Sequence, residues 1–415
     1  MQHSGAQGRY NDNVLVIGMA IGQVLSFGVL FHSFSIFLAP MQAEFGWSMT
    51  QMTGAFTLGL FCADIFGIPV GHWVDRHGGR AVMTVGAVIA SGLLLAWSYV
   101  ETLWGFYGLW IAIGFAQSMF LGNVTASVIA ANVRDYRRGL TIVAILSGLS
   151  SIVVVPLSSF VVTQWGWRTG LGVLAILLLL GPALLYAILL RGTLGSRTAE
   201  FARRNLALAE GRLPSAAIGP SPLASALRRP AFWLLAVACS VHWFVITGVL
   251  VHFLPMMQER SVAPDIAVAI FAFNGPAAVI GRLALYVVDP TNSARRSGRI
   301  AFPMFALGML ALIYVAPMGF WGLVVYALVY GMAAGVIMIV RQTAIAEIFG
   351  LRGYGAITGA LTTACILPRT MAPLSIARMR DSFGSYEPVL WILFAMILVA
   401  TIAFWLAMAG KPRQE

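Results

Sequence analysis

The sequence predicts an all-α integral membrane protein whose twelve transmembrane helices form two six-helix bundles. Of its 415 residues, 59% are hydrophobic and only 10% are charged, whereas a soluble domain carries about 25% charged residues. Apolar runs of about 20 residues, the length that crosses a bilayer, recur along the whole chain. The longest polar stretch, residues 191–229, separates six of these runs from the other six.

The apolar runs are continuous rather than alternating, which favours helices over the strands of a membrane barrel. The first bundle is expected at 1–190, a cytoplasmic linker at 191–229 and the second bundle at 230–415. In chain order the expected spans are 14–38, 49–72, 81–99, 103–131, 139–162, 169–190, 231–257, 266–288, 300–317, 320–347, 354–377 and 388–409.

The basic residues predict the orientation. With the N-terminus inside, 19 of the 26 Lys and Arg residues fall in inner segments, four in outer loops and three within spans. Because short cytoplasmic loops carry the excess of positive charge, both termini are expected in the cytoplasm and the protein in the cell inner (plasma) membrane. The net charge of +11 comes from basic residues in short loops between apolar spans, so we expect no nucleic-acid partner. The protein is expected to be a monomer in a lipid bilayer.

The loop after the second span carries a recognisable motif. Residues 71–80 read G-H-W-V-D-R-H-G-G-R. The glycines permit a tight turn and close helix approach, and Asp75, Arg76 and Arg80 can hold neighbouring helix ends in one of two conformations. The loop resembles the G-x-x-x-D-R-x-G-x-R signature of the major facilitator superfamily at the same position, which implies that fold and a gating role for these three residues.

The corresponding loop of the second half, residues 289–299, keeps an aspartate, Asp289, and three arginines. This weaker version of the motif indicates an internal repeat and adds Asp289 to the predicted gating residues. Two repeated bundles around a central path are the layout of many secondary transporters.

Further segments narrow the resemblance to one branch of the superfamily. They read F-L-A-P at 37–40, E-F-G-W-S at 44–48, Y-R-R-G-L at 136–140, S-G at 147–148 and F-G-L-R-G-Y-G at 349–355. Together these segments resemble the monocarboxylate transporters and their bacterial relatives, including oxalate/formate-type antiporters. The resemblance implies transport of a small organic anion.

The chain also departs from that branch at two places. The acidic Gly-Trp motif that opens the first span of animal members is replaced by Tyr10 to Asn13. Those relatives carry an aspartate one helical turn before the arginine of the eighth span, where this chain has Ala278. The carboxylate–arginine pair that couples protons in the relatives is therefore not reproduced in place.

Arg282, in the eighth span, is the first candidate for substrate binding. An arginine in a span costs roughly 2.5–3.5 kcal/mol on insertion scales, so it marks a functional site by default. Its planar fork matches a carboxylate, and it lies where the resembling family has its substrate-carboxylate arginine. A gating salt bridge and snorkelling to the cytoplasmic face remain the alternatives, since Val288 is only about 9 Å along the helix.

His32 and Asp64 are the candidates for proton coupling. His32 occupies the position where animal relatives carry a lysine that takes part in proton-linked binding, and histidine titrates near neutral pH. Its alternative is a neutral imidazole that donates to a nearby carbonyl. Asp64 is the deep acid of the first bundle, and an unpaired carboxylate there is unlikely to stay charged. It is expected to pair with an intramembrane arginine or to bind a proton.

Two more arginines lie within spans. The position of Arg341 near the inner end of the tenth span favours a gating or snorkelling role over substrate contact. Arg369 follows Pro368, a residue type that frees carbonyls and kinks helices. It is expected to add positive potential to the cavity or to form an ion pair. Neutral candidates for substrate hydrogen bonds are Gln117, Asn123, Tyr330 and His252, each with helix packing as the alternative.

The three arginines against one deep acid favour an anionic substrate. We therefore predict a secondary transporter of a mono- or dicarboxylate that works by alternating access with coupled protons. Anion exchange, export of a larger amphipathic compound, and a non-transporting membrane sensor or partner subunit are the alternatives. The sequence contains no phosphate-binding loop, no metal-ligand cluster and no catalytic constellation, so no enzyme activity, metal or cofactor is expected.

Overall fold

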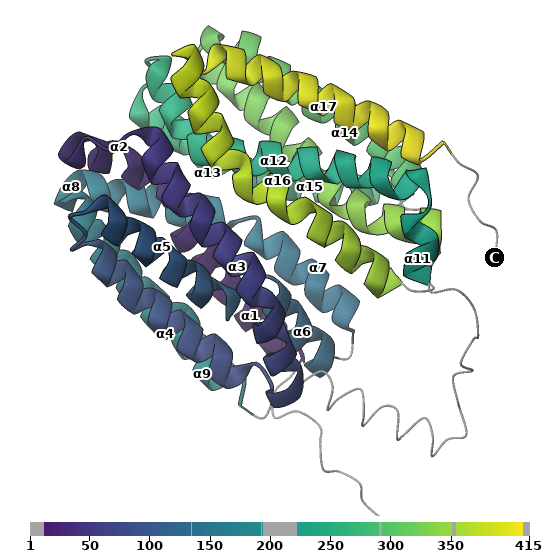
Figure 1. Cartoon of the computed structure of the whole chain (residues 1–415), viewed down its shortest axis with the longest axis horizontal. Helices are drawn as coiled ribbons and strands as arrows, with labels where there is room; N and C mark the ends of the chain where they lie inside the picture. Colours follow the sequence, from purple (N-terminus) through teal and green to yellow (C-terminus); the bar gives the residue numbers. More distant parts are fainter. Residues whose placement is uncertain are drawn as a thin grey trace, which may run out of the picture. The chain divides into compact units, whose positions relative to one another are not determined.

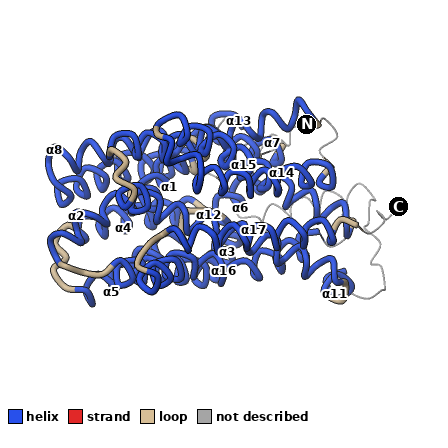
Figure 2. Tube along the Cα trace, turned by 90° about the horizontal axis from the view of Figure 1, so that it is seen from above, coloured by secondary structure: helices blue, strands red, loops and turns tan. Residues whose placement is uncertain are grey.

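The computed structural model describes residues 12–133, 135–191, 193, 222–289, 293–350 and 354–409. All regular elements in these ranges are helical and are joined by short loops (Figure 2). Within the same ranges, nine helical segments are long and apolar enough to cross a membrane. The all-helical class is thus confirmed, while the count of twelve spans and the sides of the termini stay predictions.

The chain folds into two compact units (Figure 1). The first contains residues up to Trp47 together with Leu58–Ala217, and the second contains Ser48–Thr57 together with the residues from Ile218 onward. The second unit thus includes a short segment that the sequence analysis assigned to the first bundle. The segment expected as the linker is described only at its two ends.

The first unit begins with a long helical rod in which one turn is wider than the rest. The rod consists of α1 (Asp12–Phe27), η1 (Gly28–His32) and α2 (Phe34–Phe45), where η1 is a π-helix. The elements that follow are α3 (Met49–His77), α4 (Arg80–Trp97), α5 (Leu103–Ser118), α6 (Asn123–Asn132), α7 (Tyr136–Ser147), α8 (Ser150–Leu178), η2 (Leu179–Ala183) and α9 (Leu184–Leu189).

The second unit has fewer interruptions. Several of its helices reach about 45 Å, because a 30-residue helix rises 1.5 Å per residue. The elements are α11 (Pro222–Leu227), α12 (Pro230–Glu259), α13 (Pro264–Val288), α14 (Ala294–Leu310), η3 (Ala311–Val315), η4 (Ala316–Met318), α15 (Phe320–Phe349), α16 (Tyr354–Phe383) and α17 (Glu387–Ala407).

The span expected at 103–131 is broken in the middle. Gly122 has φ 61°, in the left-handed region that favours glycine, and it separates α5 from α6. At the break, the buried carbonyl of Phe120 accepts hydrogen bonds from Gln23 Nε2 at 2.8 Å and from Thr125 Oγ1 at 3.3 Å. Side chains thus replace the missing helical bonds, which is the requirement for irregular backbone at membrane depth.

The spans expected at 139–162 and 169–190 are joined without a loop. Gly166 alone makes the turn inside α8, with φ 79° and ψ 162°. Next to it, Trp167 Nε1 and Arg168 donate to the carboxylate of Glu44, at 2.7 and 2.5 Å, and so tie the corner to the end of α2. One glycine and one solvent-exposed ion pair therefore shape the turn at residues 163–168, between the two expected spans.

Candidate functional site

The π-helix of the first unit carries His32. Its Nδ1 lies 3.4 Å from the carbonyl oxygen of Phe27 and 3.5 Å from Ser150 Oγ of α8. Gly28 lets the two helices approach, because a Cβ there would lie 2.3 Å from Val154 Cγ2. Widened turns of this kind occur frequently at functional sites. The geometry is compatible with both predicted roles, a neutral donor to a carbonyl and a proton-binding side chain.

The other candidates of the first unit differ in how their polar groups are satisfied. Gln117, at the end of α5, is 2% exposed, and neither polar atom of its amide has a hydrogen-bond partner among the described residues. Asp64 is half-buried on α3. Asn123 begins α6, and its side chain lies outside the described part of the structure. A buried amide without partners is costly, so Gln117 remains a candidate ligand of a polar substrate.

Arg282 lies where α13 and α15 come closest. A Cβ at Gly281 would lie 2.3 Å from the carbonyl oxygen of Met332, and one at Gly335 would lie 2.1 Å from that of Ala278. The two backbones are therefore in direct contact beside the arginine. Arg282 is 8% exposed, and its Nη2 is 3.4 Å from the sulfur of Met338 on α15.

Arg341 and Arg369 meet at a residue that the sequence analysis did not select, Trp243 of α12. The Cζ atom of each arginine lies 5.7 Å from the centroid of the Trp243 ring. Both distances are within the range of cation–π attraction. A tryptophan in the middle of an apolar span is so common that nothing in the sequence distinguishes it from a packing residue.

Tyr330 belongs to a buried aromatic cluster and is not among the residues that contact Arg341 or Arg369. Its ring is 4.8 Å from that of Phe305, which in turn is 5.1 Å from the imidazole of His242. Neither the hydroxyl of Tyr330 nor either ring nitrogen of His242 has a hydrogen-bond partner among the described residues. The sequence analysis selected Tyr330 but not His242 for substrate contact, and both buried groups can receive a polar ligand.

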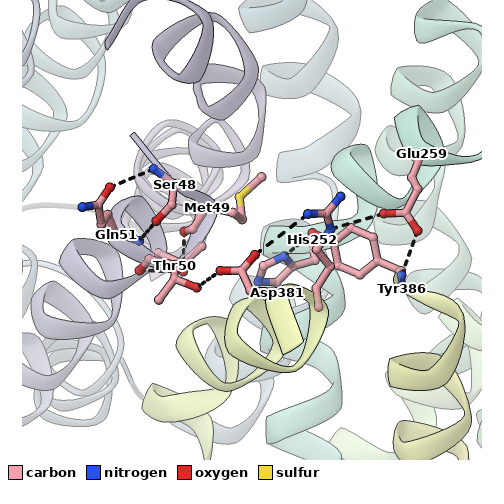
Figure 3. Close-up of polar contacts among 10 residues, drawn as sticks. Ser48, Met49, Thr50, Gln51, His252, Glu259, Asp381 and Tyr386 are labelled. Atoms are coloured by element: carbon pink, nitrogen blue, oxygen red, sulfur yellow. Dashed lines mark hydrogen bonds and ion pairs between the residues drawn. The ribbon is translucent and has the colours of Figure 1, made fainter. Parts of the chain in front are cut away.

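Both ring nitrogens of His252 have hydrogen-bond partners (Figure 3). Its Nδ1 lies 2.8 Å from Tyr386 Oη and its Nε2 lies 2.8 Å from the carbonyl oxygen of Pro373. Burial raises the pKa of the Tyr386 phenol above its usual range, so that hydroxyl stays protonated. Tyr386 N–H also donates to Glu259 at 2.8 Å. This arrangement favours a structural role for His252, the alternative to the predicted substrate contact.

Glu259 continues the same network (Figure 3). Arg380 Nε donates to its Oε2 at 3.3 Å, and Thr50 Oγ1 of α3 donates to Asp381, the neighbour of Arg380. Glu259 is the last residue of α12, and Glu44 lies near the end of α2. Each glutamate forms an ion pair with an arginine of a later helix in its own unit, Glu259 with Arg380 and Glu44 with Arg168. The two units therefore carry the same type of contact at matching places.

If His252 is structural, His252→Ala will destabilise the protein without changing substrate affinity. The side chain is fully buried, and its loss leaves Tyr386 Oη and the Pro373 carbonyl without their partner. Removing a buried hydrogen-bonding group costs about 1–3 kcal/mol for each partner left unsatisfied. Thermal unfolding in detergent should show a lowered midpoint, whereas an unchanged midpoint with a raised KM for substrate would restore the predicted binding role.

The two motif loops are held by polar contacts within their units. Gly78 has φ 85° and ends α3. Arg80 donates from Nε to the carbonyl oxygen of Ala187 at 3.0 Å, which fastens α4 to the end of α9. Asp75 is half-buried and Arg76 is exposed. The turn expected from the glycines is present, and the gating role of the charged residues stays a prediction.

In the second unit the corresponding aspartate is buried. Asp289 is 2% exposed and accepts from Ser297 Oγ at 2.9 Å and from Arg296 Nη1 at 3.4 Å. Ser293 Oγ lies 3.4 Å from the carboxylate of Glu347. The start of α14 is therefore fastened to the ends of α13 and α15. Within the described ranges, no three His, Cys, Asp or Glu side chains are grouped so as to hold a metal ion.

Long apolar helices with Arg282 buried between two of them are typical of multi-pass membrane transport proteins. A protein-family model described as Major Facilitator Superfamily matches residues 19–373. The chain belongs to this superfamily, whose members are transporters and not enzymes.

Two groups of known proteins are similar to the chain. Monocarboxylate transporter 13 of Bos taurus is 25% identical over 401 residues, which cover 94% of this chain and 87% of that protein. A D-xylose–proton symporter has a similar structure, with a TM-score of 0.72, 16% identity and coverage of 95% of this chain and 97% of that chain. A bacterial homolog of the human lysosomal transporter Spinster, in an inward-facing and occupied conformation, is also similar in structure. Its TM-score is 0.66 at 14% identity, and the match covers 95% of this chain and 96% of that chain.

Proposed function

We propose that this protein is a secondary active transporter that moves a small organic anion, a mono- or dicarboxylate, by alternating access with coupled protons. In this proposal Arg282 binds a substrate carboxylate. His32, Asp64 and Arg369 take part in proton coupling or its ion pairs, and Asp75, Arg76, Arg80 and Asp289 control the conformational change.

The burial of Arg282 carries the proposal. The residue is 8% exposed and lies at the close contact between α13 and α15. A guanidinium is always charged in proteins, so its environment favours an anion with a matching planar acceptor, which a carboxylate provides. The similarity to a monocarboxylate transporter supports the same substrate class.

Uptake by proteoliposomes that contain the purified full-length protein tests the proposal. We expect radiolabelled mono- or dicarboxylates to enter faster than into protein-free liposomes, and faster still when the outside is acidic. A requirement for internal anion without pH dependence would favour exchange, and binding without flux would favour a sensor. Uptake of neutral sugars or organic cations in the absence of any carboxylate uptake would contradict the proposal.

Replacement of His32 tests the coupling. A protonated imidazole and a bound carboxylate stabilise each other, so a histidine here links anion binding to proton binding. His32→Gln keeps a polar side chain but cannot gain a charge. We expect the variant to lose the acceleration of net uptake by an acidic exterior while it retains substrate exchange at equal pH on both sides.

Exchange at equal pH is the internal control, because it reports a folded variant that still binds substrate. If the uptake of His32→Gln follows the pH profile of the unmodified protein, His32 does not carry the coupled proton. The predicted alternative, a neutral imidazole beside the Phe27 carbonyl, would then describe its role.

A further inference from the structure

An open groove of about 500 Å³ lies where α11 meets the start of α12 in the second unit (Figure 1). Its volume is within the range of sites that bind small ligands. Five apolar side chains and one charged side chain line it: Leu227, Pro230, Trp233, Leu234, Val237 and Arg228. None of them belongs to the predicted substrate, coupling or gating residues, so the groove calls for an occupant of its own.

Trp233 forms a fixed wall of this groove. The residue is 56% exposed, yet its Nε1 donates to the carbonyl oxygen of Leu227 at 3.0 Å. The turn beside it is closed by the backbone N–H of Arg229, which donates to the carbonyl oxygen of Ala226 at 3.0 Å. An exposed indole whose polar edge is hydrogen-bonded is typical of the layer where a membrane meets water.

One face of α12 continues the groove along the helix. Trp233 and Val237 are exposed, and their spacing of four residues puts them on the same helix face. Phe232 and Leu235, on another face, are buried in the unit. From Pro230 to Val237 the helix rises about 10 Å, more than the roughly 5–8 Å of headgroup region on one side of a bilayer. The groove is therefore long enough to reach from the headgroups to the acyl chains.

The polar end of the groove is positively charged. Arg228 is exposed there, and the ion pairs found among the described residues do not include it. A guanidinium is always charged in proteins and matches the geometry of a phosphate. The groove thus combines an apolar stripe with a phosphate-binding group at one end of that stripe.

The surrounding end of the unit has the same sign of charge. The rings of Phe232 and Phe349 are 6.4 Å apart, so the start of α12 and the end of α15 lie together. Ser293 Oγ is 3.4 Å from Glu347, which adds the start of α14. The charged side chains of these segments are five arginines and two acids: Arg228, Arg229, Arg295, Arg296, Arg299, Asp289 and Glu347. Such an excess is typical of the cytoplasmic side of a membrane protein, where the leaflet contains anionic lipids.

We propose that this groove is a binding site for an anionic glycerophospholipid. Arg228 binds the phosphate, and an acyl chain lies along Trp233 and Val237. A free inorganic anion uses the charge but not the apolar stripe, and a zwitterionic lipid fills the stripe but gains less from the charge. The combination selects a negatively charged lipid, whichever substrate the protein transports.

Native mass spectrometry of the purified full-length protein in detergent tests the headgroup. We expect the first phosphatidylglycerol to bind at a concentration about fivefold lower than phosphatidylcholine with the same acyl chains. Arg228→Gln should remove this preference, because one basic residue at a membrane surface contributes about 1 kcal/mol, which is about fivefold in affinity. Arg299→Gln is the matched control and should keep the preference, since Arg299 is exposed at the same end of the unit but lies outside the groove.

Brominated lipids, which quench the fluorescence of a tryptophan that they touch, test the acyl chain. The emission of Trp233 is the difference between the unmodified protein and Trp233→Phe, both reconstituted in phosphatidylcholine nanodiscs. We expect phosphatidylglycerol with brominated chains to quench this emission at about a fivefold lower mole fraction than brominated phosphatidylcholine. The same difference measured with Arg228→Gln should show no preference between the two lipids.

Two results would overturn the lipid site. Equal binding of the two lipids by the unmodified protein, or equal effects of Arg228→Gln and Arg299→Gln, would mean that the charge of the whole surface attracts lipid and that the groove does not select it. Emission of Trp233 that neither brominated lipid quenches would mean that protein, and not lipid, covers the groove. Thermal unfolding in detergent checks that each variant is folded.

Discussion

Arg282→Ala is expected to abolish carboxylate transport, and Arg282→Lys is not expected to restore it. Alanine removes the charge and the fork together and leaves a substrate carboxylate without its partner in a buried site. Truncation of one partner of a buried, hydrogen-bonded charge pair costs about 2–5 kcal/mol. That range corresponds to a loss of roughly 30-fold to several thousand-fold in kcat/KM.

Lysine keeps the charge but loses the planar, bidentate geometry. It therefore separates the two contributions of the arginine. If positive potential alone attracts the anion, Arg282→Lys will transport with a raised KM. If the fork holds the carboxylate, the variant will be as inactive as Arg282→Ala.

Initial rates of labelled carboxylate uptake into proteoliposomes measure both variants, with Arg299→Ala as the control for loss of an exposed arginine from the same unit. Thermal unfolding in detergent checks that each variant is folded. Transport by Arg282→Ala at the rate of the unmodified protein would exclude the carboxylate clamp and leave gating as the role of this arginine.

Composition and periodicity were sufficient to predict the helical membrane class. A charge inside an apolar run is visible in the sequence, so Arg282, Arg341 and Arg369 could be selected without a structure. The glycine-containing motif at the end of α3 and the start of α4 likewise predicts its own turn, since Gly78 adopts the positive φ that such a turn requires.

The sequence could not predict which of these residues meet. Trp243 becomes a candidate only because α15 and α16 bring two arginines to its ring, and such a meeting depends on the packing of three helices. His252 shows the reverse case, because its polarity made it a substrate candidate while its hydrogen bonds to Tyr386 and Pro373 favour a structural role. Local breaks such as Gly122 depend on distant side chains, here Gln23.

The glycines of the second unit show the same dependence on packing. Gly355 and Gly359 form a G-x-x-x-G pattern in α16 that the sequence associates with helix contact. A Cβ added at either would have no other heavy atom of the described structure within 4 Å. The close contact lies elsewhere, at Gly281 and Gly335 between α13 and α15.

Gly335→Ala is therefore expected to be strongly destabilising, although it adds a single methyl group. That methyl carbon would lie 2.1 Å from the carbonyl oxygen of Ala278 and 2.8 Å from its Cα. Because the obstacle is backbone, no change of rotamer relieves it and α13 must move away from α15. Overpacking costs typically about 1–3 kcal/mol, and a backbone clash of this depth should reach about 3 kcal/mol or more.

Gly359→Ala is the matched control, since it makes the same chemical change at an exposed place in α16. Alanine favours a helix over glycine by about 1 kcal/mol, so the control should unfold at the same or a higher temperature and Gly335→Ala at a lower one. The displacement of α13 also moves Arg282, one turn beyond Ala278, away from Met338. Any folded Gly335→Ala protein should therefore show a raised KM for carboxylate, and equal unfolding temperatures with unchanged KM would contradict the close contact on which the position of Arg282 depends.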